Sequence, residues 1–131
     1  MATEDLINKI SDYLVQLNLP YEEIAQGMWV IHDEVENVDN IVVSLQEPLV
    51  VLRVKLMNVP STEKEAFFEK LLRLNASSLV HGAYALEDDH VVIVDTLEVE
   101  NLDLNEIQAS VDAITMAIAH DYKVLSKYLN K

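Results

Sequence analysis

Two consecutive stretches of the chain carry most of the information about its fold: PSTEKEAFFEKLLRLN (residues 60–75) and VHGAYALEDDHVVIV (residues 80–94). Thr62 and Glu65 have capping-box spacing, which predicts that a helix begins there and runs to about Asn75. The second stretch has apolar, β-prone flanks around an acidic turn at Asp88 and Asp89, which is typical of a β-hairpin. A helix followed by a hairpin indicates mixed α and β structure.

The first sixty residues predict one further helix and three strands. Apolar residues at helical spacing indicate a helix over 3–18, which Pro20 ends. The β-branched and aromatic run at 28–32 and the alternating runs at 40–46 and 49–59 indicate strands. In the last strand, Val50, Leu52, Val54 and Leu56 are expected to face the core.

The remainder of the chain is predicted to be one long amphipathic helix. Asp103 and Glu106 repeat the capping-box spacing before a stretch of nearly thirty residues with an apolar stripe. The complete order is helix-β-β-β-helix-β-β-helix, which predicts an α+β fold with an antiparallel sheet and helices packed on one face. We expect residues 1–131 to form a single domain.

The charge of the chain limits the classes of molecule that it can bind. The chain has 23 acidic and nine basic side chains, for a formal net charge of −14. Such a charge opposes binding to nucleic acids and to anionic membranes. It fits a solvated acidic surface as well as one that attracts basic or unfolded partners. No cysteine is present, and no signal segment or membrane span is recognisable, so we expect a cytoplasmic protein.

A pattern in the second half of the chain resembles the type III secretion chaperone-like superfamily, which includes the Tir chaperone family and the YbjN-like proteins. The residues that carry it are Leu71-Leu72-x-x-Asn75, Gly82-x-Tyr84-x-Leu86, the turn at Asp88-Asp89, the strand from Val91 and Ala119-x-x-Tyr122. The resemblance implies a small acidic homodimer that holds an extended or unfolded segment of a client protein. The alternative is a YbjN-like regulatory or stress-response protein that acts through a folded protein partner.

The candidate client-binding residues lie on the predicted strands. Trp29, Leu49, Val51, Arg53 and Met57 are expected on the sheet face away from the helices, where aromatic, aliphatic and thioether groups suit an unfolded segment. The alternative that Trp29 belongs to the core stays open.

The candidate dimer interface lies on the second helix. Phe67, Phe68, Leu71 and Leu72 place apolar groups around more than one side of that helix, which is more than one core stripe requires. The alternative is that all of them pack inside one chain.

Catalysis and metal binding find little support in the sequence. The four histidines, His32, His81, His90 and His120, form no pair with ligand spacing. The acidic loop at 33–39 lacks the glycine and the terminal glutamate of a calcium-binding loop. Asp95 interrupts an apolar strand, and we interpret it as a charge that protects a sheet edge in preference to a perturbed acid. We therefore expect no enzyme activity, no catalytic residue, no metal and no cofactor.

Overall fold

The computed structural model describes residues 3–32 and 40–130, and the predicted acidic loop at 33–39 lies outside the described residues. Within these ranges, three α-helices, six strands and a final 3-10 helix follow one another. Their bounds are α1 Thr3–Gln16, β1 Tyr21–Ala25, β2 Met28–Ile31, β3 Ile41–Gln46, β4 Leu49–Asn58, α2 Lys64–Ser77, β5 Ala83–Glu87, β6 His90–Glu98, α3 Leu104–Leu125 and η2 Ser126–Asn130.

The six strands form one antiparallel sheet in the order β1-β2-β3-β4-β6-β5. The α+β class and the antiparallel sheet are as predicted, but four strands precede α2 instead of three. The missed strand is β1, which pairs with β2 along the sheet edge. The sequence did not predict β1, because the strand contains Glu22 and Glu23, is exposed at nearly every position and has no apolar alternation.

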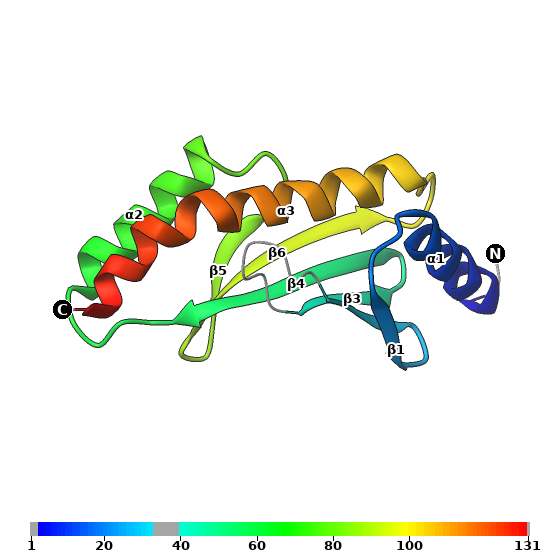
Figure 1. Cartoon of the computed structure of the whole chain (residues 1–131), viewed down its shortest axis with the longest axis horizontal. Coiled ribbons are helices and arrows are strands. Elements are labelled where there is room, and N and C mark those ends of the chain that lie inside the picture. The colour runs from blue at the N-terminus through cyan, green and yellow to red at the C-terminus, as the bar shows by residue number, and fades with distance from the viewer. Residues whose placement is uncertain (1–2, 33–39, 131) are drawn as a thin grey trace.

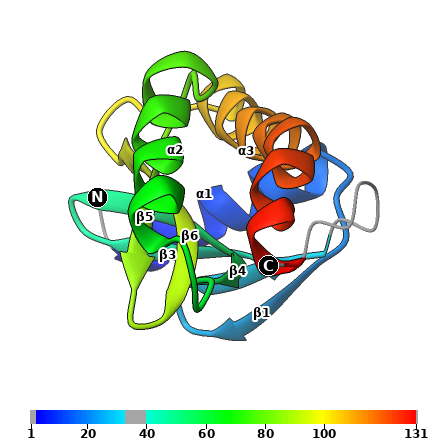
Figure 2. The same ribbon diagram turned by 90° about the vertical axis from the view of Figure 1, so that its left-hand side faces the viewer.

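The helices lie on one side of the sheet, as Figure 1 shows. The long α3 runs along the sheet, with α2 beside its C-terminal part and α1 at the other end of the molecule. Figure 2, viewed from the left of Figure 1, shows α2 and α3 next to each other above the strands. The opposite face of the sheet carries no described helix, and we call it the open face.

Strand β4 shows how the sequence divides the two faces. Val50, Leu52 and Val54 are at most 1% exposed and point into the core, as predicted. The alternation is then interrupted between Lys55 and Met57, where the pairing with β6 shifts by one residue. This bulge turns Met57 into the core instead of the open face, because one extra residue inverts the side-chain period of two.

The two predicted helix caps have different outcomes. The Asp103 carboxylate accepts a 2.9 Å hydrogen bond from the Glu106 backbone N–H at the start of α3, as expected for an N-cap. The predicted capping box of α2 is wrong. That helix begins one residue later than the box requires, with Glu63 at the N-cap in a left-handed conformation and without a side-chain cap hydrogen bond.

Candidate protein-binding surfaces

The open face is built from cross-strand rows of side chains. One row runs from Val30 on β2 through Val42, Arg53 and Val94 to Ala83 on β5. Its members point away from the helices, because they alternate with core residues along each strand. Arg53 therefore stands in the middle of a small apolar surface.

A neighbouring row adds a second cation. Lys55 pairs with Val92 on β6 and is two residues from Arg53 on the same face. Both basic side chains line a hollow of about 350 Å³ in the sheet surface. The other residues around this hollow are Asn40, Val42, Glu87, His90 and Val92.

One acid on the same face touches one of these bases. Arg53 Nε lies 3.3 Å from Glu87 Oε2, and both side chains are about half exposed, at 46% and 50%. An exposed ion pair of this kind contributes about 0–1 kcal/mol to folding stability. The hollow thus has an apolar floor with a weakly held ion pair at its rim.

The candidate client-binding residues fall on two different surfaces. Leu49, Val51 and Arg53 lie on the open face, as expected from the alternation in β4. The positions expected for Trp29 and Met57 are wrong, because both are in the core. Trp29 is fully buried, and its indole Nε1 donates a 3.0 Å hydrogen bond to Ser11 Oγ on α1. The structure does not test what any of the five residues binds.

The candidate dimer residues of α2 also divide between core and surface. Phe67 and Leu71 are buried in the core, and the Phe67 ring packs edge-on against Tyr128 with 5.2 Å between centroids. Phe68 is half-buried, whereas Leu72 is 69% exposed. Only Leu72 and part of Phe68 are therefore available on the outer side of the helix.

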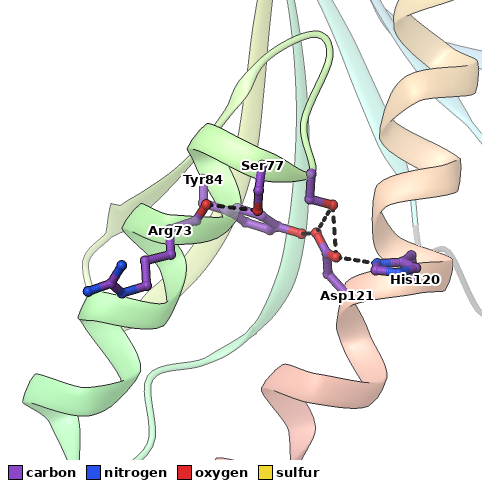
Figure 3. A network of polar contacts seen from close by, with 6 residues as sticks. Arg73, Ser77, Tyr84, His120 and Asp121 are labelled. Carbon is purple, nitrogen blue, oxygen red and sulfur yellow. Dashed lines mark hydrogen bonds and ion pairs between the residues drawn. The ribbon is translucent and has the colours of Figure 1, made fainter.

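A buried polar cluster ties α2, β5 and α3 together (Figure 3). The Asp121 carboxylate on α3 is fully buried. It accepts hydrogen bonds from the Tyr84 hydroxyl at 2.6 Å and from the Ser78 hydroxyl at 2.8 and 2.9 Å. The His120 side chain is 79% exposed, and its Nδ1 lies 2.8 Å from Asp121 Oδ1. A buried carboxylate is tolerated here because donors surround it.

This cluster changes the acidity of the tyrosine. Burial raises the pKa of the Tyr84 hydroxyl far above its usual value, and the adjacent Asp121 carboxylate raises that pKa further. Burial and a neighbouring negative charge both disfavour a phenolate. Tyr84 therefore remains a neutral hydrogen-bond donor and is part of the framework that holds α3.

The pattern that carried the family resemblance has a structural basis in the same place. The Asn75 side chain bonds both backbone groups of Tyr84, with 2.6 Å from Tyr84 N–H to Asn75 Oδ1 and 3.4 Å from Asn75 Nδ2 to the Tyr84 carbonyl. Gly82 has φ +80°, and a Cβ there would lie 2.8 Å from the Val94 carbonyl oxygen. Asn75, Gly82 and Tyr84 thus fix the end of α2 against β5, and sequence reasoning did not assign these roles.

Asp95 has a different role from the predicted one. Its strand, β6, lies between β4 and β5, so the interpretation as an edge-strand charge is wrong. The Asp95 carboxylate faces the helices and accepts hydrogen bonds from the buried Ser110 hydroxyl on α3 and from its neighbour's N–H at Thr96. It anchors α3 to the sheet.

The four histidines belong to different parts of the chain: His32 directly follows β2, His81 precedes β5, His90 begins β6 and His120 is on α3. His32 and His90 each contact an asparagine, with 2.8 Å from ring Nδ1 to the Oδ1 of Asn40 and Asn58 respectively. Residues 3–32 and 40–130 contain no group of three or more His, Asp or Glu side chains arranged to hold a metal ion. None of the described helices is long and apolar enough to cross a membrane.

Comparison with known proteins assigns this geometry to a family. The family model CesT_Tir_1 matches residues 3–131, so the chain belongs to the CesT_Tir_1 family. This confirms the resemblance to the type III secretion chaperone-like superfamily. It places the chain among non-enzymatic, chaperone-like binding proteins, as the sequence predicted. No curated protein sequence matches the chain.

Several solved structures share the fold at low sequence identity. A chain of the ExsC-ExsE complex has a TM-score of 0.69 at 13% identity, over 94% of this chain and 95% of that one. A chain of the heterodimeric ExoU-SpcU complex from the type III secretion system of Pseudomonas aeruginosa has a TM-score of 0.66 at 19% identity, over 92% and 97%. YbjN from E. coli has a TM-score of 0.66 at 15% identity, over 88% and 90%.

Proposed function

We propose that this protein is a homodimeric, cytoplasmic, chaperone-like protein of a bacterial cell that holds an extended or unfolded segment of a client protein on the open face of its sheet. The observation that carries the proposal is the hollow on that face, with its valine floor and basic rim. In a family of chaperone-like proteins, a sheet face without a helical cover is the natural place for a bound segment.

The electrostatics of the open face support a protein client. In a chain of net charge −14, most acidic side chains lie on helices, turns and strand ends, whereas Arg53 and Lys55 stand at the centre of this face. A surface that mixes small apolar groups with a few charges can contact the alternating side chains of an extended segment. The two sheet edges, β1 and β5, offer backbone groups for the same purpose.

The proposed dimer contact is the outer side of α2 together with strand β5. Leu72 is 69% exposed, Val80 84% and Leu86 50%, and they belong to α2, the connection after it, and β5. Exposed leucine and valine side chains on a helix, an edge strand and the connection between them are typical of a surface that a second copy covers.

The fold also leaves room for a second function, that of a YbjN-like regulatory or stress-response protein. YbjN is described as a proposed transcription regulator, and its TM-score to this chain equals that of the ExoU-SpcU chain. The excess of acids over bases disfavours contact with DNA, so such regulation would act through a folded protein partner.

The client proposal is tested with the partner captured from the native host. We expect a stoichiometric, exported protein that is unfolded in the bound segment. Val42→Gln on the open face should weaken its binding measured by calorimetry, because the change removes apolar contact without adding charge. Met116→Gln, at an exposed position on α3, is the control. A folded cytosolic partner, or a client insensitive to Val42→Gln, would contradict the open-face proposal.

The dimer proposal has a matched pair of variants. Leu72 and Met116 are 69% and 71% exposed on different helices. Leu72→Glu should halve the mass in light scattering, because it places charges inside the contact, and Met116→Glu should leave the mass unchanged. A dimer that survives Leu72→Glu would exclude this face of α2.

A further inference from the structure

The open face differs in charge from the rest of the molecule. On the described strands, three acids lie on this face, Glu22, Glu87 and Glu98, and they are on outer strands or at a strand end. The two bases are at its centre, on β4. The chain as a whole has 23 acidic and nine basic side chains, so a pair of bases on a central strand, with the acids of the described strands farther out, runs against the average composition.

The spacing of the two bases matches that of an extended ligand. Arg53 and Lys55 are two residues apart on one strand and one face, which separates their Cα atoms by about 6.5 Å. Alternate side chains of an extended peptide have the same separation. Two carboxylates at positions i and i+2 of a segment along β4 would therefore each meet one base.

The floor beneath the bases fits the neighbours of such carboxylates. Arg53 lies between Val42 and Val94 in its row, and Lys55 has Val92 on its β6 side. Small apolar side chains of a bound segment can pack on the partly exposed Val42 and Val94 while its acids reach the bases. The apolar stems of Arg and Lys add to the same surface.

In the free protein, Glu87 takes the place that an external carboxylate would need. Its Oε2 lies 3.3 Å from Arg53 Nε, and both partners are about half exposed. A pair this exposed is weak and readily exchanged. A ligand carboxylate can thus displace Glu87 from Arg53. Glu87 lowers the affinity for such a ligand, because both carboxylates compete for the same guanidinium.

We infer that the open face selects extended protein segments with two acidic side chains at positions i and i+2 flanked by apolar ones, through Arg53 and Lys55, with Glu87 as an internal competitor. This inference rests on the proposed function and adds to it the chemistry of the bound segment. The protein would thus bind acidic segments although its own net charge is −14.

The test uses three labelled peptides in fluorescence anisotropy at low salt. The first has the sequence Thr-Val-Thr-Glu-Thr-Glu-Thr-Val-Thr, and the other two have glutamine or lysine in place of both glutamates. We expect the glutamate peptide to bind best, by about two- to fivefold for each carboxylate relative to glutamine. The preference should fall as salt is added, because ions screen exposed charges.

Variants of Arg53, Lys55 and Glu87, compared with variants of a control ion pair on α2, test whether the peptide binds on the open face. Arg53→Gln and Lys55→Gln should each reduce the preference, and Glu87→Gln should raise affinity for the glutamate peptide by about two- to fivefold. The control is the exposed pair Arg73 and Glu69 on α2, with 3.1 Å between Arg73 Nε and Glu69 Oε2. Arg73→Gln and Glu69→Gln change the net charge by the same amounts and should leave binding unchanged.

Opposite results overturn the inference separately from the proposed function. Equal binding of the glutamate and glutamine peptides, no saturable binding of the glutamate peptide, or equal effects of the two ion pairs would each overturn it. If the native client still depends on Val42 in any of these cases, the open face holds clients without reading their charge. If the client is also insensitive to Val42→Gln, the proposed function fails too.

Discussion

The two faces of the sheet are made from the same strands but have opposite chemistry. On the face toward the helices, large side chains such as Trp29, Leu52 and Ile93 are fully buried. On the open face, the residues next to them are small or charged: Val30, Arg53 and Val94. The core residues contribute most to folding stability, whereas open-face residues that stay partly or fully exposed, such as Val42, Arg53 and Val94, are available for recognition.

The largest effect should come from the helix-facing side. Trp29→Ala removes the largest fully buried side chain and its hydrogen bond to Ser11, so we expect it to lower the free energy of unfolding by about 3–5 kcal/mol. Urea denaturation followed by circular dichroism measures this, since the variant has no tryptophan fluorescence. A loss below about 1 kcal/mol would contradict the core position of Trp29.

The buried polar cluster on the same side should have the next largest effect. Tyr84→Phe removes one of the donors to the buried Asp121 carboxylate, and we expect it to cost about 1.5–3 kcal/mol of stability. Tyr122→Phe, at a 39% exposed position on α3, is the control and should change little.

The same tyrosine predicts a dependence on alkaline pH. The pKa of Tyr84 is raised in the folded state, so the unfolded chain loses this proton first. The stabilisation is complete below about pH 10, the usual tyrosine value, and is lost as the pH rises further, by up to about 1.4 kcal/mol per pH unit. Urea denaturation between pH 9 and 11 should show the difference between wild type and Tyr84→Phe shrinking. A constant difference would exclude a raised Tyr84 pKa.

Two adjacent valines on β3 compare the faces directly. Val43 is 1% exposed toward the helices, and Val42 is half-buried on the open face. Val43→Thr places a hydroxyl in the core and should cost about 1–3 kcal/mol. Val42→Thr should cost less than about 0.5 kcal/mol. Equal losses in urea denaturation would mean that the open face is covered in solution, for example by a second copy.

The smallest effect on stability should come from the charges of the open face. Arg53→Gln breaks the half-exposed ion pair with Glu87, and we expect a change in the free energy of unfolding of at most about 1 kcal/mol. Thermal denaturation at low and at high salt measures it. A larger loss would show that Arg53 serves folding in addition to recognition.

The sequence predicted the elements that depend on local pattern. Alternation along β4 identified Val50, Leu52 and Val54 as core, and the acidic turn at Asp88 and Asp89 identified the β5-β6 hairpin. These signals lie within a few residues of one another, so they are readable without a structure.

The errors arose where the answer depended on distant residues. The local sequence does not indicate which face of the sheet Trp29 occupies. The bulge that turns Met57 toward the core depends on the pairing of β4 with β6. The two hydroxyl donors to Asp121, Tyr84 and Ser78, are 37 and 43 residues away, so no spacing rule could have joined them. The open-face hollow combines residues of β3, β4, β5 and β6 in the same way.

The central pairing of β4 with β6 also has a consequence for how the chain folds. It joins Leu49–Asn58 to His90–Glu98 and is the strand pairing that connects the four N-terminal strands to the C-terminal hairpin in the described sheet. Pairings this distant in sequence form late and slow folding. During synthesis, β4 therefore presents an unpaired edge until residue 98 has left the ribosome. A protein that we propose to hold unfolded segments passes through a stage at which its own strand edge needs the same protection.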